Sequence, residues 1–225
     1  MVFFAGSSAL SIDDSDHSEE DQVLDDDPRE ITELTESSGN IEYVAKEDAP
    51  PLPSPIDRVF YVNSYRNEVF PAPNPSYLTG LQRSKIFIYS CGSLWTSVIP
   101  CLVLRGIPLA IARSPTLQFK VLLLNSKHDR ETANMTGLDF VNAIVRSLKR
   151  TMQVDTPNDC NTFVHTDFIT HVVYVRQGAV DPCVEALNEL GIQCVGVNGE
   201  SEESATISES TLYRVLKDLV GRNDD

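Results

Sequence analysis

Short apolar runs alternate with amphipathic stretches from about residue 56 onwards, and this alternation predicts the elements of the chain. Apolar, β-branched and aromatic runs typical of strands occur at 58–62, 86–89, 120–124, 169–175 and 192–197. Helical periodicity separates them at 77–81, 94–99, 108–113, 136–150, 182–190 and 210–220. Strand–helix alternation at this spacing predicts an α/β fold, a Rossmann-like parallel sheet with flanking helices. The runs at 86–89 and 120–124 are expected to be buried on both faces.

Residues with known end preferences mark several of these helices. Thr136 is expected to cap the long helix, and Asp181–Pro182 supplies a cap and a first helical residue for the next one. Gly191 is expected to close that helix, and Ser210 to begin the last one. Pro100 is expected to end or kink the helix at 94–99.

The first 55 residues lack this alternation. Residues 11–48 hold fifteen Asp and Glu against two basic residues, in a chain whose net charge is −15. Such a composition buries too little apolar surface to offset the entropy of ordering the chain. We therefore predict an acidic and Pro-rich disordered tail over residues 1–55, with segment 11–36 as its clearest part. Residues 56–225 are expected to form the folded domain.

Composition excludes several classes of protein. Outside the tail the chain is close to neutral, so it lacks the clustered Lys and Arg that nucleic acids require. Five scattered cysteines without a C-x-x-C motif are typical of reduced thiols, which predicts a cytoplasmic protein. Residues 1–10 lack a basic start and are too short for a signal peptide or membrane span, so no membrane contact is expected.

The loop after the predicted strand at 86–89 is the first candidate site. Gly92 lets the backbone turn and approach a ligand, while Ser93, Thr96 and Ser97 place hydroxyls on the first turn of the following helix. Ligands of parallel sheets collect beyond the carboxyl ends of the strands, and the start of a helix suits a phosphate. An ordinary serine cap after a glycine has the same spacing, so both interpretations stay open.

The loop after the strand at 120–124 is the second candidate. Asn125, Arg130 and Glu131 lie in a polar stretch straight after a core strand, where they are suited to hold the rest of a ligand. A solvated connection has the same composition, and the sequence does not separate the two interpretations.

The sequence does not favour a metal site or covalent catalysis. His165, Asp167 and His171 have no fourth ligand at metal-site spacing, so ordinary core or surface histidines are favoured. Cys91 and Ser93 lie outside a G-x-S-x-G motif, which argues against covalent catalysis. We expect no metal site and no cofactor in the protein itself. Any divalent cation is expected to arrive with a phosphorylated ligand.

Residues 89–100 read Tyr-Ser-Cys-Gly-Ser-Leu-Trp-Thr-Ser-Val-Ile-Pro, which resembles the Gly-Pro-Gly-Ser-Leu-Tyr-Thr-Ser signature of the CofD-like family. A second group of residues is similar to that family's second motif and follows the first motif along the chain, as it does in the family. It consists of Asn125, Glu131-Thr132, Thr136 and Asp139. The family includes 2-phospho-L-lactate transferases and bacterial gluconeogenesis factors that bind nucleotide sugars. The resemblance covers roughly residues 56 to 200 and is closer to the gluconeogenesis-factor branch.

This resemblance implies a nucleotide-like or nucleotide-sugar small molecule as the partner, and 2-phospho-L-lactate transferase-type activity. The alternative is a catalytically inactive nucleotide-sugar-binding protein with a regulatory or interaction role in central carbon metabolism. Catalytic residues are not assigned, and a homo-oligomer is left open. The implied ligand- and phosphate-binding residues are Gly92, Ser93, Thr96, Ser97, Asn125, Glu131, Thr132 and Asp139.

The chain departs from the family pattern in several places. Ser90-Cys91 stands where the family has Gly-Pro, Ala133 where it has Asp, and Phe140 where it has His. The family also opens with a strand and a Gly-Gly-Gly-type loop, whereas only Gly6 and Gly39 precede Gly80 here. We therefore expect the chain to hold the C-terminal portion of a CofD-like domain, as a fragment or a divergent remnant.

Overall fold

The computed structural model describes residues 2–6, 52–157, 160–201 and 205–221. The segment 11–36, predicted to be disordered, lies outside these residues, so that expectation stays a prediction. Within the range expected to be tail, strand β1 (Val2–Gly6) pairs antiparallel with β2 (Ile56–Val62).

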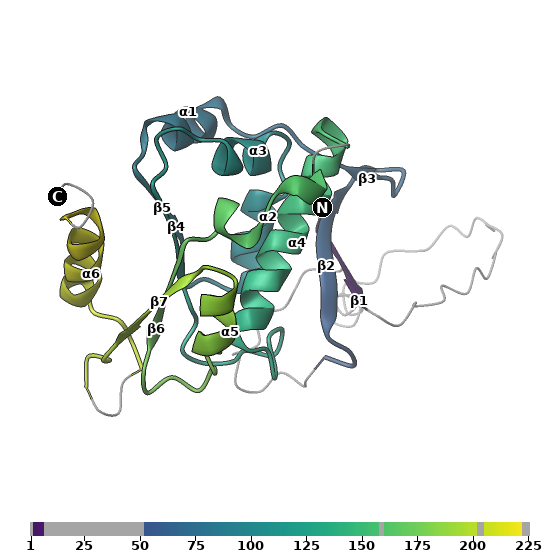
Figure 1. The fold of residues 1–225 in the computed structure, drawn as a ribbon. Coiled ribbons are helices and arrows are strands. Elements are labelled where there is room, and N and C mark those ends of the chain that lie inside the picture. Colours follow the sequence, from purple (N-terminus) through teal and green to yellow (C-terminus); the bar gives the residue numbers. More distant parts are fainter. Residues whose placement is uncertain (1, 7–51, 158–159, 202–204, 222–225) are drawn as a thin grey trace, which may run out of the picture.

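A four-stranded parallel sheet forms the middle layer of the molecule (Figure 1). Its strands lie side by side in sequence order: β4 (Ile86–Tyr89), β5 (Phe119–Leu123), β6 (His171–Val175) and β7 (Gln193–Val197). All five residues of β5 are buried, as expected for a central parallel strand. The predicted Rossmann-like α/β fold is confirmed. The prediction for β4 is corrected, because this strand lies at the edge and three of its four residues are only partly buried.

Helices cover both faces of this sheet (Figure 1). Helix α6 (Glu209–Gly221) covers one face, and α2 (Ile99–Leu102), α4 (Gly137–Asp155) and α5 (Val184–Glu189) cover the other. The antiparallel sheet β1-β2-β3, with β3 at Glu68–Val69, packs against the far side of α4. The remaining elements are α1 (Pro75–Arg83), the π-helix η1 (Leu94–Val98), α3 (Ile107–Ala112), and the 3₁₀ turns η2 (Cys160–Thr162) and η3 (His165–Asp167).

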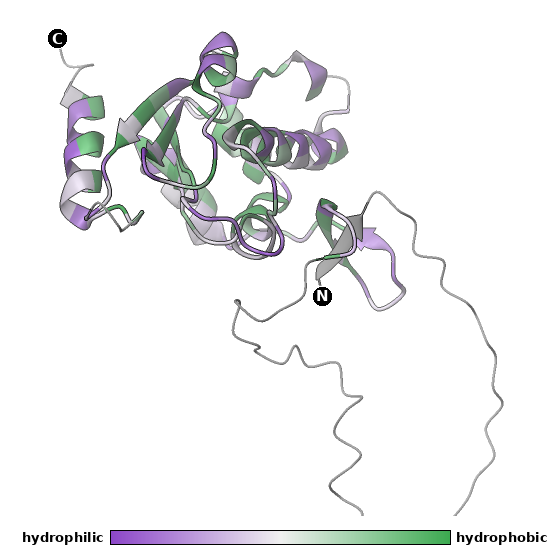
Figure 2. Ribbon diagram, turned by 90° about the horizontal axis from the view of Figure 1, so that it is seen from below, coloured by the Kyte–Doolittle hydropathy of each residue, from purple (hydrophilic) through white to green (hydrophobic). Residues whose placement is uncertain are grey.

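Alternation along the strands divides the core in two. Leu122 and Val172 face the α4 side, where Ile144 is fully buried, whereas Val121 and Val173 face Leu219 of α6. In Figure 2, hydrophobic colour runs along strands of the parallel sheet, and α6 carries both hydrophobic and hydrophilic colours. Among the described residues, no helix is both long enough and apolar enough to cross a bilayer.

Local hydrogen bonds explain where helix ends differ from the prediction. Pro100 does not stop the helical stretch, because it lies in the first turn of α2, directly after the π-type turn of η1. Helix α5 begins at Val184 because the Asp181 carboxylate accepts from the Cys183 amide at 2.9 Å and turns the chain beforehand. Helix α6 is capped by Ser208 rather than Ser210, since the Ser208 hydroxyl accepts from the Thr211 amide at 3.1 Å.

Candidate functional site

The two candidate loops lie next to each other because β4 and β5 are neighbours, with Tyr89 opposite Leu122. The Ser93 hydroxyl donates to Oε2 of Glu131 at 2.6 Å, and Nδ2 of Asn125 donates to the Gly92 carbonyl at 3.4 Å. Both bonds join the β4 loop to the β5 loop. We call this meeting of Gly92, Ser93, Thr96, Ser97, Asn125 and Glu131 the loop site.

Ser93 precedes a helical stretch formed by η1 and α2 together, but its hydroxyl does not cap that stretch. The Ser93 carbonyl accepts from the amides of Ser97 and Val98, at 2.9 and 3.1 Å, whereas the hydroxyl proton goes to Glu131. The leading amides of a helix have no partner inside it. The first turn therefore keeps polar N–H groups that the Ser93 side chain does not occupy.

Thr96 and Ser97 complete the first turn, and both are exposed. The Thr96 hydroxyl lies 3.5 Å from Oε2 of Glu131, at the outer limit of a hydrogen bond. Ser97 lies against Gly92, where a Cβ would come within 3.0 Å of the Ser97 Cβ. Gly92 does not have a positive φ. Close approach of Ser97, rather than a left-handed backbone, is what calls for glycine at this position.

The second loop is shaped by Asp129, which sequence reasoning did not single out. Its Oδ1 accepts from the amides of Glu131 and Thr132, at 2.9 and 2.8 Å, and from the Thr132 hydroxyl at 2.8 Å. An Asp followed by polar residues is the usual signal for such a side-chain turn. Thr132 is fully buried within this turn, where its hydroxyl helps to shape the loop. Its assignment as a ligand-binding residue stays a prediction.

Asp139 is placed in a capping box at the start of α4. Its Oδ2 accepts from the Thr136 amide and hydroxyl, at 2.8 and 2.7 Å, and its own amide donates to the Thr136 hydroxyl at 3.3 Å. The predicted cap at Thr136 is confirmed. The carboxylate of Asp139 is thus engaged at the start of α4.

An apolar hollow of about 530 Å³ adjoins the loop site on the α2 side and was not anticipated from the sequence. Burial, followed by the nearby Cys101 thiol, raises the pKa of Tyr77 to about 12, so this phenol keeps its proton at neutral pH. Gly92 and Ser97 belong to both the hollow and the loop site. The lining residues are Tyr77, Phe87, Ile88, Tyr89, Ser90, Gly92, Ser97, Val98, Cys101 and Leu102.

A second hollow, of about 350 Å³, lies beyond the carboxyl ends of β5 and β6. It shares Asn125 with the loop site and carries one cationic side chain, the exposed Lys127. Its other lining residues are Cys91, Leu123, Leu124, Ser126, Val175, Ala205, Thr206, Ile207 and Leu212.

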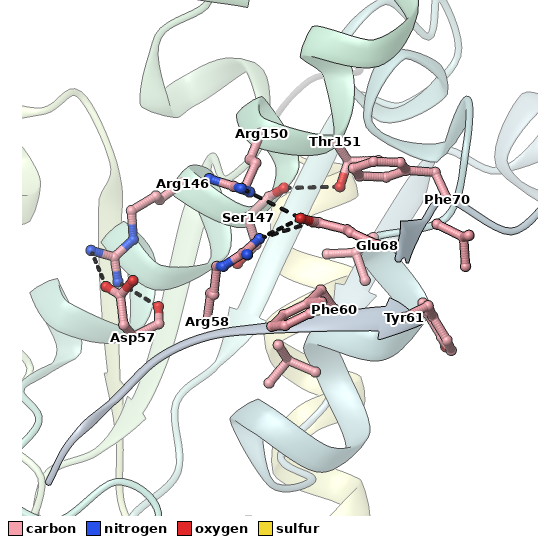
Figure 3. Close-up of a pocket in the computed structure, with 13 residues that line it drawn as sticks. Asp57, Arg58, Phe60, Tyr61, Glu68, Phe70, Arg146, Ser147, Arg150 and Thr151 are labelled. Atoms are coloured by element: carbon pink, nitrogen blue, oxygen red, sulfur yellow. Dashed lines mark hydrogen bonds and ion pairs between the residues drawn. The ribbon is translucent and has the colours of Figure 1, made fainter. Parts of the chain in front are cut away.

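A small cavity of about 70 Å³ lies elsewhere, between β2, β3 and α4 (Figure 3). Arg58 donates twice to Glu68, at 2.9 and 2.8 Å, and its guanidinium lies 4.1 Å from the centre of the Phe60 ring. Arg150 reaches the same carboxylate at 3.5 Å, and Arg146 lies 3.5 Å from Asp57. These pairs tie the antiparallel sheet to α4, and the cavity contains none of the predicted site residues.

In the parts of the chain that the structure describes, no three His, Cys, Asp or Glu side chains are grouped as metal ligands. Nε2 of His165 lies 3.1 Å from Oδ1 of Asn142, and Nδ1 of His171 lies 2.8 Å from the Thr170 hydroxyl. The Asp167 carboxylate accepts from the Val164 amide at 2.7 Å. These three side chains have separate local partners. The expectation that the protein holds no metal of its own stays a prediction.

Comparison with known proteins agrees with the motifs in the two loops. A family model described as 2-phospho-L-lactate transferase CofD matches residues 28–205. The uncharacterized protein YNL011C of Saccharomyces cerevisiae is 30% identical over 176 residues, which are 75% of this chain and 39% of that protein.

Two crystal structures of protein BH3568 from Bacillus halodurans, one described as a member of the UPF0052 family, share the fold. They superpose with TM-scores of 0.55 and 0.51 at 19% and 20% identity, covering 72% and 74% of this chain. In both cases 51% of the solved chain is matched. The present chain thus spans about half the length of these structures.

Proposed function

Because the chain belongs to the family described as 2-phospho-L-lactate transferase CofD, we propose that it binds a phosphorylated, nucleotide-type ligand at the loop site. The observation that carries the proposal is the meeting of Gly92 and Ser93 with Asn125 and Glu131 at the carboxyl ends of two parallel strands. We further propose activity of the 2-phospho-L-lactate transferase type.

The phosphate is assigned to the first turn of the stretch 94–102. Its leading amides are left uncapped by the Ser93 hydroxyl, and oriented amides with a positive helix end favour anions. Thr96 and Ser97 add exposed hydroxyls on the same turn. Asn125 and Glu131 connect this turn to the second loop, where the rest of the ligand would lie.

The nucleotide-type part of the proposal is supported by the apolar hollow beside Gly92 and Ser97. Phe87 and Tyr89 pack edge to face in its wall, with ring centres 4.8 Å apart, and Tyr77 adds a third aromatic ring. Aromatic walls with a few polar groups at one end are typical of sites that hold a planar ring and a polar substituent.

Two exposed cysteines allow the position of the bound ligand to be tested. Cys91 lines the hollow at β5 and β6, and Cys101 lines the apolar hollow, so they flank the loop site on both sides. A thermal-shift screen of nucleotide sugars and dinucleotides identifies a ligand, and alkylation of each cysteine is then followed by mass spectrometry. We expect the ligand to slow alkylation of Cys91 and Cys101, and to leave that of Cys194 on β7 unchanged.

Cys194 is the internal control, because it reports any general loosening or tightening of the fold. Unchanged alkylation of both flanking cysteines at a saturating ligand concentration would place the ligand elsewhere. In a second incubation, with an added nucleotide-activated 2-phospho-L-lactyl donor and a hydroxyl acceptor, transfer of the 2-phospho-L-lactyl group to the acceptor with release of the nucleotide would favour a transferase. Binding without a product would favour the alternative, a regulatory or interaction protein that binds nucleotide sugars.

A further inference from the structure

Glu131 already places a negative charge at the loop site. Its Oε2 accepts a 2.6 Å hydrogen bond from the Ser93 hydroxyl and lies 3.5 Å from that of Thr96. This carboxylate contacts the hydroxyls of Ser93 and Thr96 at the start of the helical stretch. The proposed phosphate would use the same hydroxyls. Two anions do not share one set of donors without strong repulsion.

We propose that Glu131 is an internal competitor that determines which anions the loop site accepts. A free anion must displace the carboxylate from Ser93 and also meets its charge, so small anions bind weakly. A larger ligand gains further contacts in the adjoining hollows and displaces Glu131 at a net gain. The inference rests on the proposed phosphate site and adds the residue that gives it specificity.

The second loop is built so that this side chain can move while its backbone stays in place. Asp129 fixes the amide of Glu131 at 2.9 Å, and the buried Thr132 locks the same turn. Glu131 itself is only partly buried. Release of Ser93 therefore needs a rotation about the side-chain bonds of Glu131, a fast and local motion, and no rearrangement of the loop.

The test uses inorganic pyrophosphate, the full chain and a metal chelator, with affinities measured by titration calorimetry at constant ionic strength. Glu131→Gln keeps an oxygen that accepts from Ser93 but removes the charge. We expect this variant to bind pyrophosphate at least tenfold more tightly than the wild type. Glu189→Gln, an exposed carboxylate on α5, makes the same change in net charge and is expected to leave the affinity unchanged.

Ser93→Ala is added in the Glu131→Gln background, because in the wild type it removes both a phosphate contact and the anchor of the competitor. We expect the double variant to lose about tenfold to a hundredfold in affinity relative to Glu131→Gln, the range for a hydrogen bond to a charged group. This arm tests the phosphate site itself.

The two failures are distinguishable. Weaker or unchanged binding in Glu131→Gln, combined with a loss on adding Ser93→Ala, would overturn the competitor role and leave the phosphate site standing. In that case Glu131 contacts the ligand or merely joins the two loops. Equal affinities in all four proteins would overturn the phosphate site and the competitor role with it. An equal gain in Glu189→Gln would show a general charge effect and also overturn the competitor role.

Discussion

Lys120 brings an ammonium group into an otherwise apolar strand. This residue of β5 is only 6% exposed, and its Nζ donates to the Asp167 carbonyl at 2.7 Å. Burial lowers the pKa of the ammonium below its usual 10.5, although the charge of Asp167 acts in the opposite direction. Removing a charge from water is costly, and a single carbonyl offsets only part of that cost.

We expect Lys120→Met to keep or raise the free energy of unfolding at neutral pH and to flatten its dependence on pH. In the wild type the unfolded chain binds this proton more tightly than the folded chain, so stability rises as the pH is raised towards 10.5. Urea unfolding at neutral pH and at about pH 10 measures the difference. Lys217→Met, an exposed lysine of α6, is the matched control. A large loss at neutral pH would contradict this expectation.

At the scale of the elements, the sequence predicts best those features that depend on residues a few positions apart. Thr136 and Asp139 lie three residues apart, and their capping box follows from that spacing. The meeting of the two candidate loops also follows, because parallel strands align their carboxyl ends. The hydrogen bond from Ser93 to Glu131 could not be predicted from the sequence, because it joins residues 38 positions apart and depends on the conformations of both side chains.

The apolar hollow was not foreseen for a similar reason. Tyr77 comes from α1 and Phe87 from β4, and only their packing around α2 creates the space. Likewise, the run at 58–62 has the composition of any strand, and nothing in it indicates that β2 pairs in a separate antiparallel sheet. Edge and centre positions are decided by the partners that a strand finds in space.

The capping box gives a prediction at the scale of the helix. We expect Thr136→Ala and Asp139→Ala each to lower the free energy of unfolding by about 0.5 to 2 kcal/mol, the usual effect of losing a cap. Ligand affinity at the loop site should stay unchanged, because both side chains serve the start of α4. Chemical unfolding and calorimetry of the same variants measure the two quantities. A selective loss of affinity in Asp139→Ala would return this carboxylate to the ligand site.

For the molecule as a whole, α6 is the helix that covers the second face of the parallel sheet (Figure 1). Leu219 is 6% exposed and packs with Val121 and Val173, whereas Tyr213 of the same helix is 68% exposed. We expect Leu219→Ala to cost about 2 to 5 kcal/mol of stability, as for other buried leucines. Tyr213→Ala is the control and should change stability by no more than about 0.5 kcal/mol. Equal effects in urea unfolding would mean that α6 is not a packed layer.

The sequential order of β4, β5, β6 and β7 has a consequence for how the chain is made. During synthesis the amino-terminal strand leaves the ribosome first, and each later strand emerges when its neighbour is already present to pair with it. The sheet can therefore grow by one strand and one crossover at a time, without waiting for distant sequence. Helix α6 emerges after the last strand, so the face lined by Val121 and Val173 stays uncovered until then. Until α6 is in place, the nascent sheet presents this apolar face to other chains, which favours aggregation.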